Sequence, residues 1–374
     1  MIKVLTVLGT RPEAIKLAPV IKEIEKHDDK LISRVCATGQ HREMLDPFLR
    51  LFDIKPDWDL EIMKPNQTLF DVTVSALSKL RPVLETENPD IVLVQGDTTT
   101  AFVAALAAFY LKIKIGHVEA GLRTADKYNP FPEEINRRLI SHLTDLHFAP
   151  TQRAKDNLLA EGIDEASVFV TGNTVIDALF MILERTKGQN LLADLPLQPD
   201  KKLILVTAHR RESFGEGLTN ICKALKEIAE QAKDVQIVYP MHLNPNVRGP
   251  VRRLLEGVEK ILLIEPLDYV RFVHLMNRAY LILTDSGGIQ EEAPSLGKPV
   301  LVMRGTTERP EAIEAGAAKL VGTNTDRIVE ETLRLLRDPS QYAKMANMRN
   351  PFGDGQAGPR IVDAISRCFR GGTL

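Results

Sequence analysis

The stretch Lys3-Val4-Leu5-Thr6-Val7-Leu8 near the start of the chain is followed directly by Gly9-Thr10-Arg11-Pro12-Glu13. The first run is apolar almost throughout instead of alternating in polarity, and such runs are typical of parallel strands that helices cover on both faces. The polar, glycine-containing stretch after it leads into the amphipathic segment Pro12–Lys26. Strand, loop and helix in this order predict the first unit of a parallel, doubly wound α/β sheet.

The same alternation continues along the chain and restarts after Thr171-Gly172-Asn173. We therefore predict two Rossmann-like doubly wound domains that face each other across a cleft. The first domain is predicted to span residues 1–170 with the C-terminal helix 358–374, and the second residues 171–357. The predicted strands are Lys3–Leu8, Ser33–Ala37, Ile91–Gln95, Lys114–Val118, Leu146–Ala149, Leu203–Thr207, Gln236–Tyr239, Ile261–Ile264, Leu281–Thr284 and Val300–Met303. The predicted helices are Pro12–Lys26, Leu69–Glu87, Thr98–Leu111, Leu218–Gln231, Tyr269–Asn277, Ile289–Leu296, Arg327–Leu336 and Pro359–Phe369.

Composition argues against several classes of protein. The 374 residues carry 48 Lys and Arg against 50 Asp and Glu, a formal net charge of −2, so the chain lacks the basic field of a nucleic-acid-binding scaffold. No stretch of about 18 apolar residues occurs, and the apolar start is too short for a signal peptide, so neither a membrane span nor export is expected. Three widely spaced cysteines, Cys36, Cys222 and Cys368, predict no disulfide framework and favour a reducing cytoplasm.

Motifs for common cofactors are missing from the expected places. The pattern G-x-G-x-x-G occurs only at residues 353–358, where it follows a polar loop instead of a strand, so we interpret it as a coincidence. No phosphate-binding Walker sequence occurs, and His117-Val118-Glu119 lacks the P-C-x-x-C partner of a zinc deaminase. We therefore expect no nicotinamide, metal or other cofactor.

Polar residues follow the predicted strands, where open α/β sheets bind their ligands. Thr10 and Glu13 are predicted to form a capping box. Arg11 and Lys16 place two cations near the same helix N-terminus. Because the helix dipole disfavours cations there, they indicate an anionic ligand between them.

A second candidate site for an anion lies in Ser286-Gly287-Gly288. Backbone N–H groups at such a strand-to-helix turn can approach an anion closely. Glu292, about one turn into the helix, could accept hydrogen bonds from ribose hydroxyls. A plain turn capped by Ser286 explains the same residues equally well.

Four ionisable residues are candidates for acid and base chemistry: Asp97, Glu119, Glu133 and His209. Carboxylates that meet in a cleft can take different pKa values and divide acid and base roles. Three of them also have a structural interpretation: Asp97 as an N-cap of the helix from Thr98, Glu133 as a first-turn acid, and His209 as a polar residue at a strand end. Four such positions together favour function. Phe272, at helical spacing, is more typical of a core than of base stacking.

Long motifs of the chain resemble those of the non-hydrolysing bacterial UDP-N-acetylglucosamine 2-epimerases. The resemblance covers essentially the whole chain, and it implies a glycosyltransferase-B type fold and a cytoplasmic homodimer. The segments that carry it are Gly9–Lys16, Gln95–Thr100, Gly116–Arg123, Phe131–Arg137, His209–Ser213, Thr284–Glu292 and Arg304–Glu311.

The resemblance implies a reversible conversion of UDP-N-acetylglucosamine to UDP-N-acetylmannosamine, an isomerisation that serves polysaccharide biosynthesis. The C2 proton is not acidic, so the family eliminates UDP to form a 2-acetamidoglucal and adds UDP back with C2 protonated on the opposite face. This route needs an acid, a base and stabilisation of the departing diphosphate. A glycosyltransferase or a hydrolysing 2-epimerase of the same fold, and a non-enzymatic nucleotide-sugar sensor, are alternatives.

The resemblance also implies roles for individual residues, although it does not divide the acid and base roles. The implied catalytic residues are Asp97, Glu119, Glu133 and His209, the last of which would stabilise diphosphate charge. The implied substrate-binding residues are Arg11, Lys16, Leu267, Phe272, Ser286, Gly287, Gly288, Glu292 and Arg309. An allosteric pocket for a second UDP-N-acetylglucosamine is implied at Gln40, His41, Gln67, Glu134, Arg210 and His242. Asn66 replaces an Arg found in some activated relatives, so weaker activation is expected.

Overall fold

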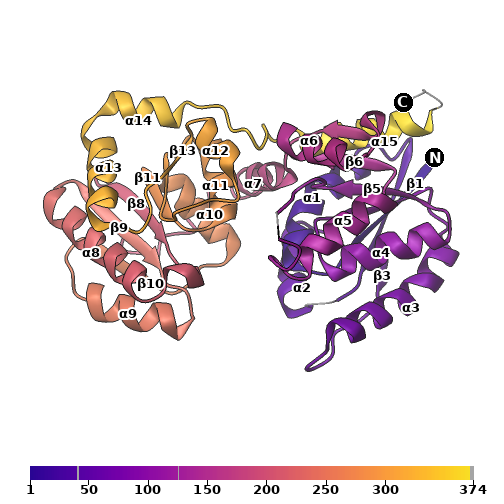
Figure 1. Cartoon of the computed structure of the whole chain (residues 1–374), viewed down its shortest axis with the longest axis horizontal. Coiled ribbons are helices and arrows are strands. Elements are labelled where there is room, and N and C mark those ends of the chain that lie inside the picture. Colours follow the sequence, from indigo (N-terminus) through magenta and orange to yellow (C-terminus); the bar gives the residue numbers. More distant parts are fainter. Residues whose placement is uncertain (40–41, 125, 371–374) are drawn as a thin grey trace. The chain divides into compact units, whose positions relative to one another are not determined.

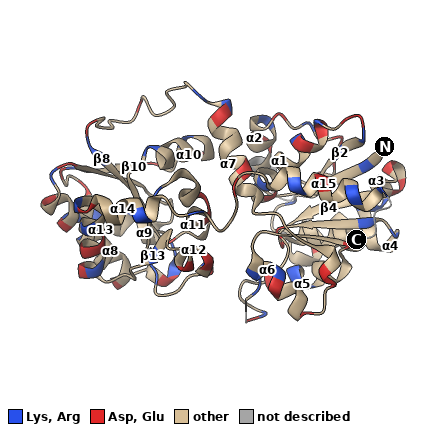
Figure 2. Ribbon diagram, turned by 90° about the horizontal axis from the view of Figure 1, so that it is seen from above, with Lys and Arg blue, Asp and Glu red and all other residues tan. Residues whose placement is uncertain are grey.

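The computed structural model describes residues 1–39, 42–124 and 126–370. The chain forms two compact units, which Figure 1 colours by sequence. Unit 1 consists of Met1–Ala178 and Gly353–Leu374, and unit 2 consists of Leu179–Phe352. Lys and Arg as well as Asp and Glu are distributed over the helices of each unit (Figure 2), as expected for a balanced surface charge.

Unit 1 contains a parallel sheet with strand order β3-β2-β1-β4-β5-β6-β7. The order reverses between β1 and β4, and this topological switch point is where doubly wound sheets bind ligands. The side chains of Val4, Leu5, Val7 and Leu8 are fully buried because helices cover both faces of the sheet. The strands are β1 Ile2–Leu8, β2 Leu31–Ala37, β3 Trp58–Asp59, β4 Ile91–Gln95, β5 Lys114–Val118, β6 Leu146–Ala149 and β7 Val168–Val170.

Helices cover the sheet of unit 1, and α15 packs against α1. Gly358, in the first turn of α15, approaches the Pro19 carbonyl so closely that a Cβ there would lie 3.3 Å from its oxygen. The helices are α1 Arg11–Glu25, α2 Arg42–Leu51, α3 Leu69–Glu87, α4 Thr99–Tyr110, α5 Glu133–Leu143, α6 Gln152–Ala160, the 3₁₀ helix η1 Glu165–Ser167, and α15 Ala357–Phe369. Helix α7, Thr174–Arg185, contains the boundary between the units.

Unit 2 repeats the architecture with the parallel order β10-β9-β8-β11-β12-β13. Its switch point lies between β8 and β11. The strands are β8 Lys202–Thr207, β9 Val235–Pro240, β10 Ile261–Ile264, β11 Leu281–Thr284, β12 Val300–Val302 and β13 Ala318–Leu320. The helices are η2 Arg211–Ser213, α8 Glu216–Gln231, α9 Pro245–Leu255, α10 Tyr269–Arg278, α11 Gly287–Glu292, η3 Ala293–Leu296, α12 Pro310–Glu314, α13 Thr325–Arg337 and α14 Pro339–Ala346.

The predicted fold class, two Rossmann-like doubly wound units, is confirmed, and every predicted strand has a counterpart. The short strands β3, β7 and β13 were missed because two or three residues carry no readable pattern. The predicted helix Ile289–Leu296 is wrong in its second half, where the chain forms the 3₁₀ helix η3. Pro294, which has no N–H to donate, stands at that change.

Two further sequence interpretations can be compared with the structure. The glycine pattern at residues 353–358 follows no strand and leads into α15, in agreement with its interpretation as a coincidence. Cys36, Cys222 and Cys368 are free thiols, and burial raises the pKa of Cys36 and of Cys222 to about 12. Within the described ranges, no helix is long and apolar enough to cross a membrane.

Candidate active site

Strand β5 ends at Val118, so Glu119 stands at the carboxyl edge of the sheet in unit 1. The Lys16 ammonium lies 2.6 and 2.7 Å from the two carboxylate oxygens of Glu119. Asn173 Nδ2 donates to the same carboxylate at 3.1 Å, and the side-chain amide of Gln95 donates to it as well. With only 5% of the Glu119 side chain exposed, these donors compensate a charge that is otherwise costly to bury. The anion that Lys16 contacts is thus part of the protein.

The backbone of Glu119 is strained, with φ at 65°. Such a conformation costs a residue other than glycine about 1–3 kcal/mol, and it persists mainly where the surrounding structure enforces it at functional sites. Here the bonds from Lys16, Gln95 and Asn173 hold the carboxylate in place. The strain therefore supports a functional assignment of Glu119.

Glu13 joins the loop after β1 to the loop after β4. Its carboxylate accepts from the backbone N–H groups of Gly9 at 2.9 Å and Thr10 at 2.7 Å, and from the Thr98 hydroxyl at 2.6 Å. The predicted capping box at Thr10 and Glu13 is confirmed. Complete burial raises the pKa of Glu13, and the bonds from Thr98 and Thr10 oppose that rise.

Asp97 lies in the loop after β4 and forms an ion pair with Arg137 of α5. The guanidinium of Arg137 donates to its carboxylate, and Asn136 Nδ2 donates to its backbone carbonyl at 2.9 Å. The interpretation of Asp97 as a helix cap is wrong. Thr98 caps α4 by accepting from the N–H of Ala101 at 3.0 Å, and the carboxylate of Asp97 pairs with Arg137 instead.

His117 fixes the backbone just before Asp97. Its Nε2 lies 2.7 Å from the carbonyl oxygen of Gly96, so Nε2 carries the proton and donates it. Nδ1 is buried, and no described residue bonds to it. Complete burial lowers the pKa of His117 to about 3, because a charged imidazolium cannot be solvated there.

The low pKa of His117 predicts an acid-sensitive fold. The unfolded chain binds a proton at this side chain below about pH 6.5 and the folded chain does not until about pH 3, so stability is lost as the pH falls through this window. The loss from this group is about 1.4 kcal/mol per pH unit. His117→Gln, which has no ionisable ring, should reduce the slope of unfolding free energy against pH between pH 6 and 4.5. Urea unfolding at several pH values measures this, and equal slopes in both proteins would contradict it.

Glu133 and Glu134 form the first turn of α5, where acids favour a helix N-terminus. Glu133 is half-buried, in the position expected of a first-turn acid. Glu134 is fully buried, and its carboxylate accepts from the N–H of Thr124 at 3.0 Å, from Arg137 at 3.3 Å and from Arg138 at 2.8 Å. The predicted allosteric residue Glu134 thus already has three protein donors.

The switch point of unit 2 brings His209 and Asp285 together. The paired strand ends Thr207 and Thr284 place the two loops side by side. Asp285 is fully buried, and its Oδ2 accepts from the backbone N–H groups of His209 at 2.6 Å and Arg210 at 2.7 Å. Its Oδ1 lies 3.2 Å from Nδ1 of His209. Burial opposes its ionisation, but the bonds from His209 and Arg210 hold the pKa of Asp285 below its usual value.

Two guanidinium groups flank Gly287 at the start of α11. A Cβ built on Gly287 would lie 3.9 Å from an Nη of Arg210 and 4.0 Å from Cζ of Arg309. The guanidinium of Arg309 is also held by the carboxylate of Glu291. Ser286 occupies the cap position without a capping bond from its side chain, so a structural turn explains its hydroxyl less well than expected. The predicted allosteric residue Arg210 therefore lies beside the predicted substrate-binding glycine.

The other predicted nucleotide-binding residues lie around α10 and α11. Glu292 ends α11, and its Oε2 accepts from the hydroxyl of Tyr269 at 2.9 Å. Phe272 is half-buried on α10, and Leu267 is half-buried in the loop that precedes α10.

The remaining predicted residues are more dispersed. Arg11 is exposed in the first turn of α1. Gln67 accepts a bond from the N–H of Lys64 at 3.0 Å. His242 is exposed, and its ring stacks on that of His209. Gln40 and His41 lie outside the described residues.

Sequence reasoning missed the residues that contact the candidate site residues Asp97, Glu119, His209 and Glu292. These contacting residues are Gln95, Arg137, Asn173, Asp285 and Tyr269. Gln95 and Asp285 stand at strand ends inside motifs that the sequence analysis singled out, and this position was the available signal. Asn173 lies far along the chain from Glu119, so its contact could not be read from local pattern.

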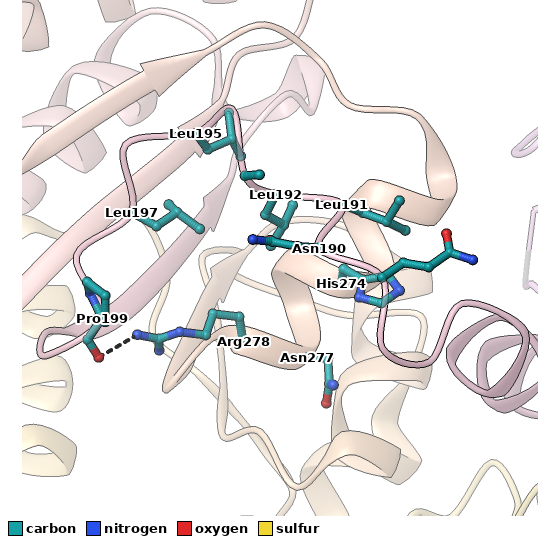
Figure 3. A pocket seen from close by; sticks show the side chains of 11 residues that line it. Asn190, Leu191, Leu192, Leu195, Leu197, Pro199, His274, Asn277 and Arg278 are labelled. Atoms are coloured by element: carbon teal, nitrogen blue, oxygen red, sulfur yellow. Dashed lines mark hydrogen bonds between the residues drawn. The ribbon is translucent and has the colours of Figure 1, made fainter.

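A pocket of about 530 Å³ lies elsewhere in unit 2, between residues 189–199 and α10 (Figure 3). Arg278 of α10 donates there to the Pro199 carbonyl at 3.0 Å, and this bond joins the segment 189–199 to the helix. None of the predicted catalytic or substrate-binding residues lines this pocket. Among the side chains that the structure describes, no group of His, Cys, Asp or Glu forms a metal site.

The fold and the two switch-point sites define an α/β protein of the glycosyltransferase-B type. The model of the UDP-N-acetylglucosamine 2-epimerase family matches residues 22–366. The chain belongs to this family. A UDP-N-acetylglucosamine 2-epimerase of Yersinia pestis is 58% identical over 369 residues, which are 97% of this chain and 98% of the relative.

Solved structures of relatives have the same fold. The UDP-GlcNAc 2-epimerase of Neisseria meningitidis, bound to UDP-GlcNAc, is 56% identical with a TM-score of 0.86, over 97% of this chain and 99% of that one. The UDP-GlcNAc 2-epimerase of Methanocaldococcus jannaschii, in complex with UDP-GlcNAc and UDP, is 38% identical with a TM-score of 0.77, over 98% of this chain and 99% of that one.

Proposed function

We propose that this protein interconverts UDP-N-acetylglucosamine and UDP-N-acetylmannosamine without hydrolysing them. The observation that carries the proposal is the strained, buried Glu119, fixed by three donors at the carboxyl edge of the sheet. A Cβ on Gly96, the residue before Asp97, would lie 3.8 Å from Oε2 of Glu119. Strained conformations cost free energy and cluster at functional sites. Membership of the epimerase family supports the choice of substrate.

The proposed reaction eliminates UDP and adds it back. A base removes the C2 proton while the bond from C1 to the diphosphate breaks, which gives 2-acetamidoglucal and UDP. UDP then returns to C1 as an acid protonates C2 on the opposite face. Asp97, Glu119 and Glu133 supply the carboxylates for these transfers. Arg137 pairs with Asp97 and Lys16 pairs with Glu119, and these contacts hold the two side chains in place.

Residues of unit 2 bind the UDP part in this proposal. Backbone N–H groups of Ser286, Gly287 and Gly288 bind the diphosphate, with Arg309 beside Gly287 and His209 opposing the charge that develops on leaving. Glu292 binds the ribose, and Leu267 and Phe272 lie beside the uracil.

Incubation with UDP-N-acetylglucosamine in D₂O tests the proposed reaction. Proton NMR should show UDP-N-acetylmannosamine, with deuterium at C2 of the nucleotide sugars. Free N-acetylmannosamine with UDP would indicate a hydrolysing enzyme. Transfer of the sugar to an acceptor without deuterium at C2 would indicate a glycosyltransferase. Binding without turnover would indicate a sensor, and each of these three results would overturn the proposal.

We also propose that a second UDP-N-acetylglucosamine activates the enzyme. A relative whose structure holds both UDP-GlcNAc and UDP supports this. The pocket would use Gln40, His41, Gln67, Glu134, Arg210 and His242. Because Asn66 replaces an arginine of some activated relatives, activation should be weaker than in a relative with that arginine. The rate from UDP-N-acetylmannosamine should rise several-fold when traces of UDP-N-acetylglucosamine are added. Hyperbolic kinetics that these traces leave unchanged would refute the proposal.

Unit 1 offers a surface for the proposed homodimer. Helices α3 and α5 both pack against α4 (Figure 1) and expose large apolar side chains. On α3, Phe70 is 83% exposed and Val74 64%, and on α5 Leu139 is 43% exposed. Such groups are typical of protein contacts. Sedimentation velocity should give twice the mass of 41.7 kDa, and a monomer would refute the dimer.

The free thiols support a cytoplasmic location.

A further inference from the structure

Two histidine rings form a stack at the switch point of unit 2. The ring centroids of His209 and His242 are 5.3 Å apart, and their planes differ by 12°. His209 follows β8, whereas His242 follows β9, the neighbouring strand. The hydrogen-bond surroundings of each ring decide which of its two nitrogens carries a proton.

The neighbours of the two rings differ in kind. The backbone N–H of Asn244 donates to Nδ1 of His242 at 3.1 Å, so that nitrogen carries no proton. Nδ1 of His209 instead lies 3.2 Å from Oδ1 of Asp285, a carboxylate oxygen that only accepts. That oxygen is buried and has no hydrogen bond of good geometry from any described residue, His209 included, so its contact with Nδ1 is electrostatic and favours a proton, not a lone pair, on the facing nitrogen. The proton therefore belongs on Nδ1 of His209.

Asp285 cannot easily turn away from His209. Its other oxygen, Oδ2, accepts from two successive backbone N–H groups, those of His209 and Arg210. The Tyr239 hydroxyl donates to the carbonyl of Ala208 at 2.8 Å and fixes the chain just before His209. The carboxylate thus holds both the backbone and the ring of the same histidine.

We propose that Asp285 is a positioning residue: it fixes the Nδ1-protonated form of His209 and stabilises its imidazolium, so that Nε2–H points to the departing diphosphate. The role of the diphosphate rests on the proposed function, whereas the state of the ring does not. A cation held in place opposes the charge that grows on the leaving group in the transition state. A neutral His209 ring with its proton on Nε2 would still donate one hydrogen bond to the diphosphate, but it would carry no positive charge.

Asp285→Asn tests this assignment. Its amide oxygen can keep the two backbone N–H bonds, while its NH₂ group replaces Oδ1 and donates to Nδ1 of His209. The variant should therefore force the proton to Nε2 and remove support for the cation. We expect kcat to fall about 100-fold and KM to change less than about 3-fold, because the loss concerns the transition state.

A matched control is Asp338→Asn in the same unit. Asp338 accepts from the successive backbone N–H groups of Ser340 at 2.9 Å and Gln341 at 3.2 Å, in the same manner as Asp285, but from no histidine. Its kcat should stay within about 2-fold of wild type. In a His209→Gln background, Asp285→Asn should cost less than about 2-fold more, because it acts through the ring.

The spectroscopic readout uses ¹⁵N-labelled histidine in the free enzyme at pH 8.5, with His209→Gln to assign the signals. Wild type and Asp338→Asn should show a protonated Nδ1 at His209, and Asp285→Asn a bare one. A wild-type His209 with a bare Nδ1 would overturn the proposal without any variant. If Asp285→Asn shows a bare Nδ1 at His209 but keeps the wild-type kcat, the proposed link between Asp285 and catalysis is overturned. If wild type fails to epimerise, the proposed function falls, while the spectra still decide whether Asp285 sets the state of His209.

Discussion

Glu119→Gln is expected to lower turnover at least about 10²-fold, the usual scale of a positioned acid or base. The glutamine occupies the same volume but cannot accept a proton from C2 or return one. Its amide must also place an N–H near the Lys16 ammonium or the Asn173 amide, which both donate to Glu119 in the wild type. Turnover is measured by NMR in both directions, together with incorporation of deuterium at C2.

The matched control is Glu87→Gln, which changes another lysine-paired acid of unit 1. Glu87 lies 3.5 Å from Lys3 and accepts from Trp58 Nε1 at 2.8 Å. It ends α3, before the amino end of β4, and so stands at the opposite edge of the sheet. Its turnover should stay within about 2-fold of wild type. Asp97→Asn should resemble Glu119→Gln, and wild-type rates in both of these would remove the assignment of the catalytic acids.

Gly121→Ala is expected to destabilise the protein by about 4 kcal/mol, a loss at the upper end for single substitutions. Gly121 has φ of +91°, and a Cβ there would lie 2.1 Å from the carbonyl oxygen of Ala154 and 2.7 Å from its carbon. These are backbone atoms of α6, so no side chain can move aside to relieve the contact. Either the loop that carries Glu119 or the helix must shift. Urea unfolding measures the loss.

Gly162→Ala separates the two causes of that loss. Gly162 has a similar φ of +83°, but nothing lies within 4 Å of the added Cβ. This variant should lose only about 1 kcal/mol, the cost of the left-handed backbone without a clash. Equal losses at the two glycines would show that the approach of Ala154 is not what requires glycine at position 121.

Local pattern was sufficient for most of the fold. Continuous apolar runs such as residues 3–8 predicted central parallel strands, because a strand covered on both faces needs no alternation. Pattern was insufficient at β3, which has two residues, and at Pro294, where a helical run continues as a 3₁₀ turn. For the site, the sequence placed polar residues after strands but did not supply the distances between them.

By itself, then, the sequence determined the two doubly wound sheets, the strand ends that carry the polar residues and the family, because these depend on short-range periodicity and on long motifs. Only the tertiary structure decided which residues meet. Lys16, Gln95 and Asn173 surround Glu119 because α1 begins at the sheet edge where β4 ends in Gln95, and the loop with Asn173 returns to that edge. Asp285 lies against His209 because β8 and β11 are neighbours although 73 residues separate Thr207 and Leu281. Contacts of this kind form when chain segments pack in space, and no local pattern encodes them.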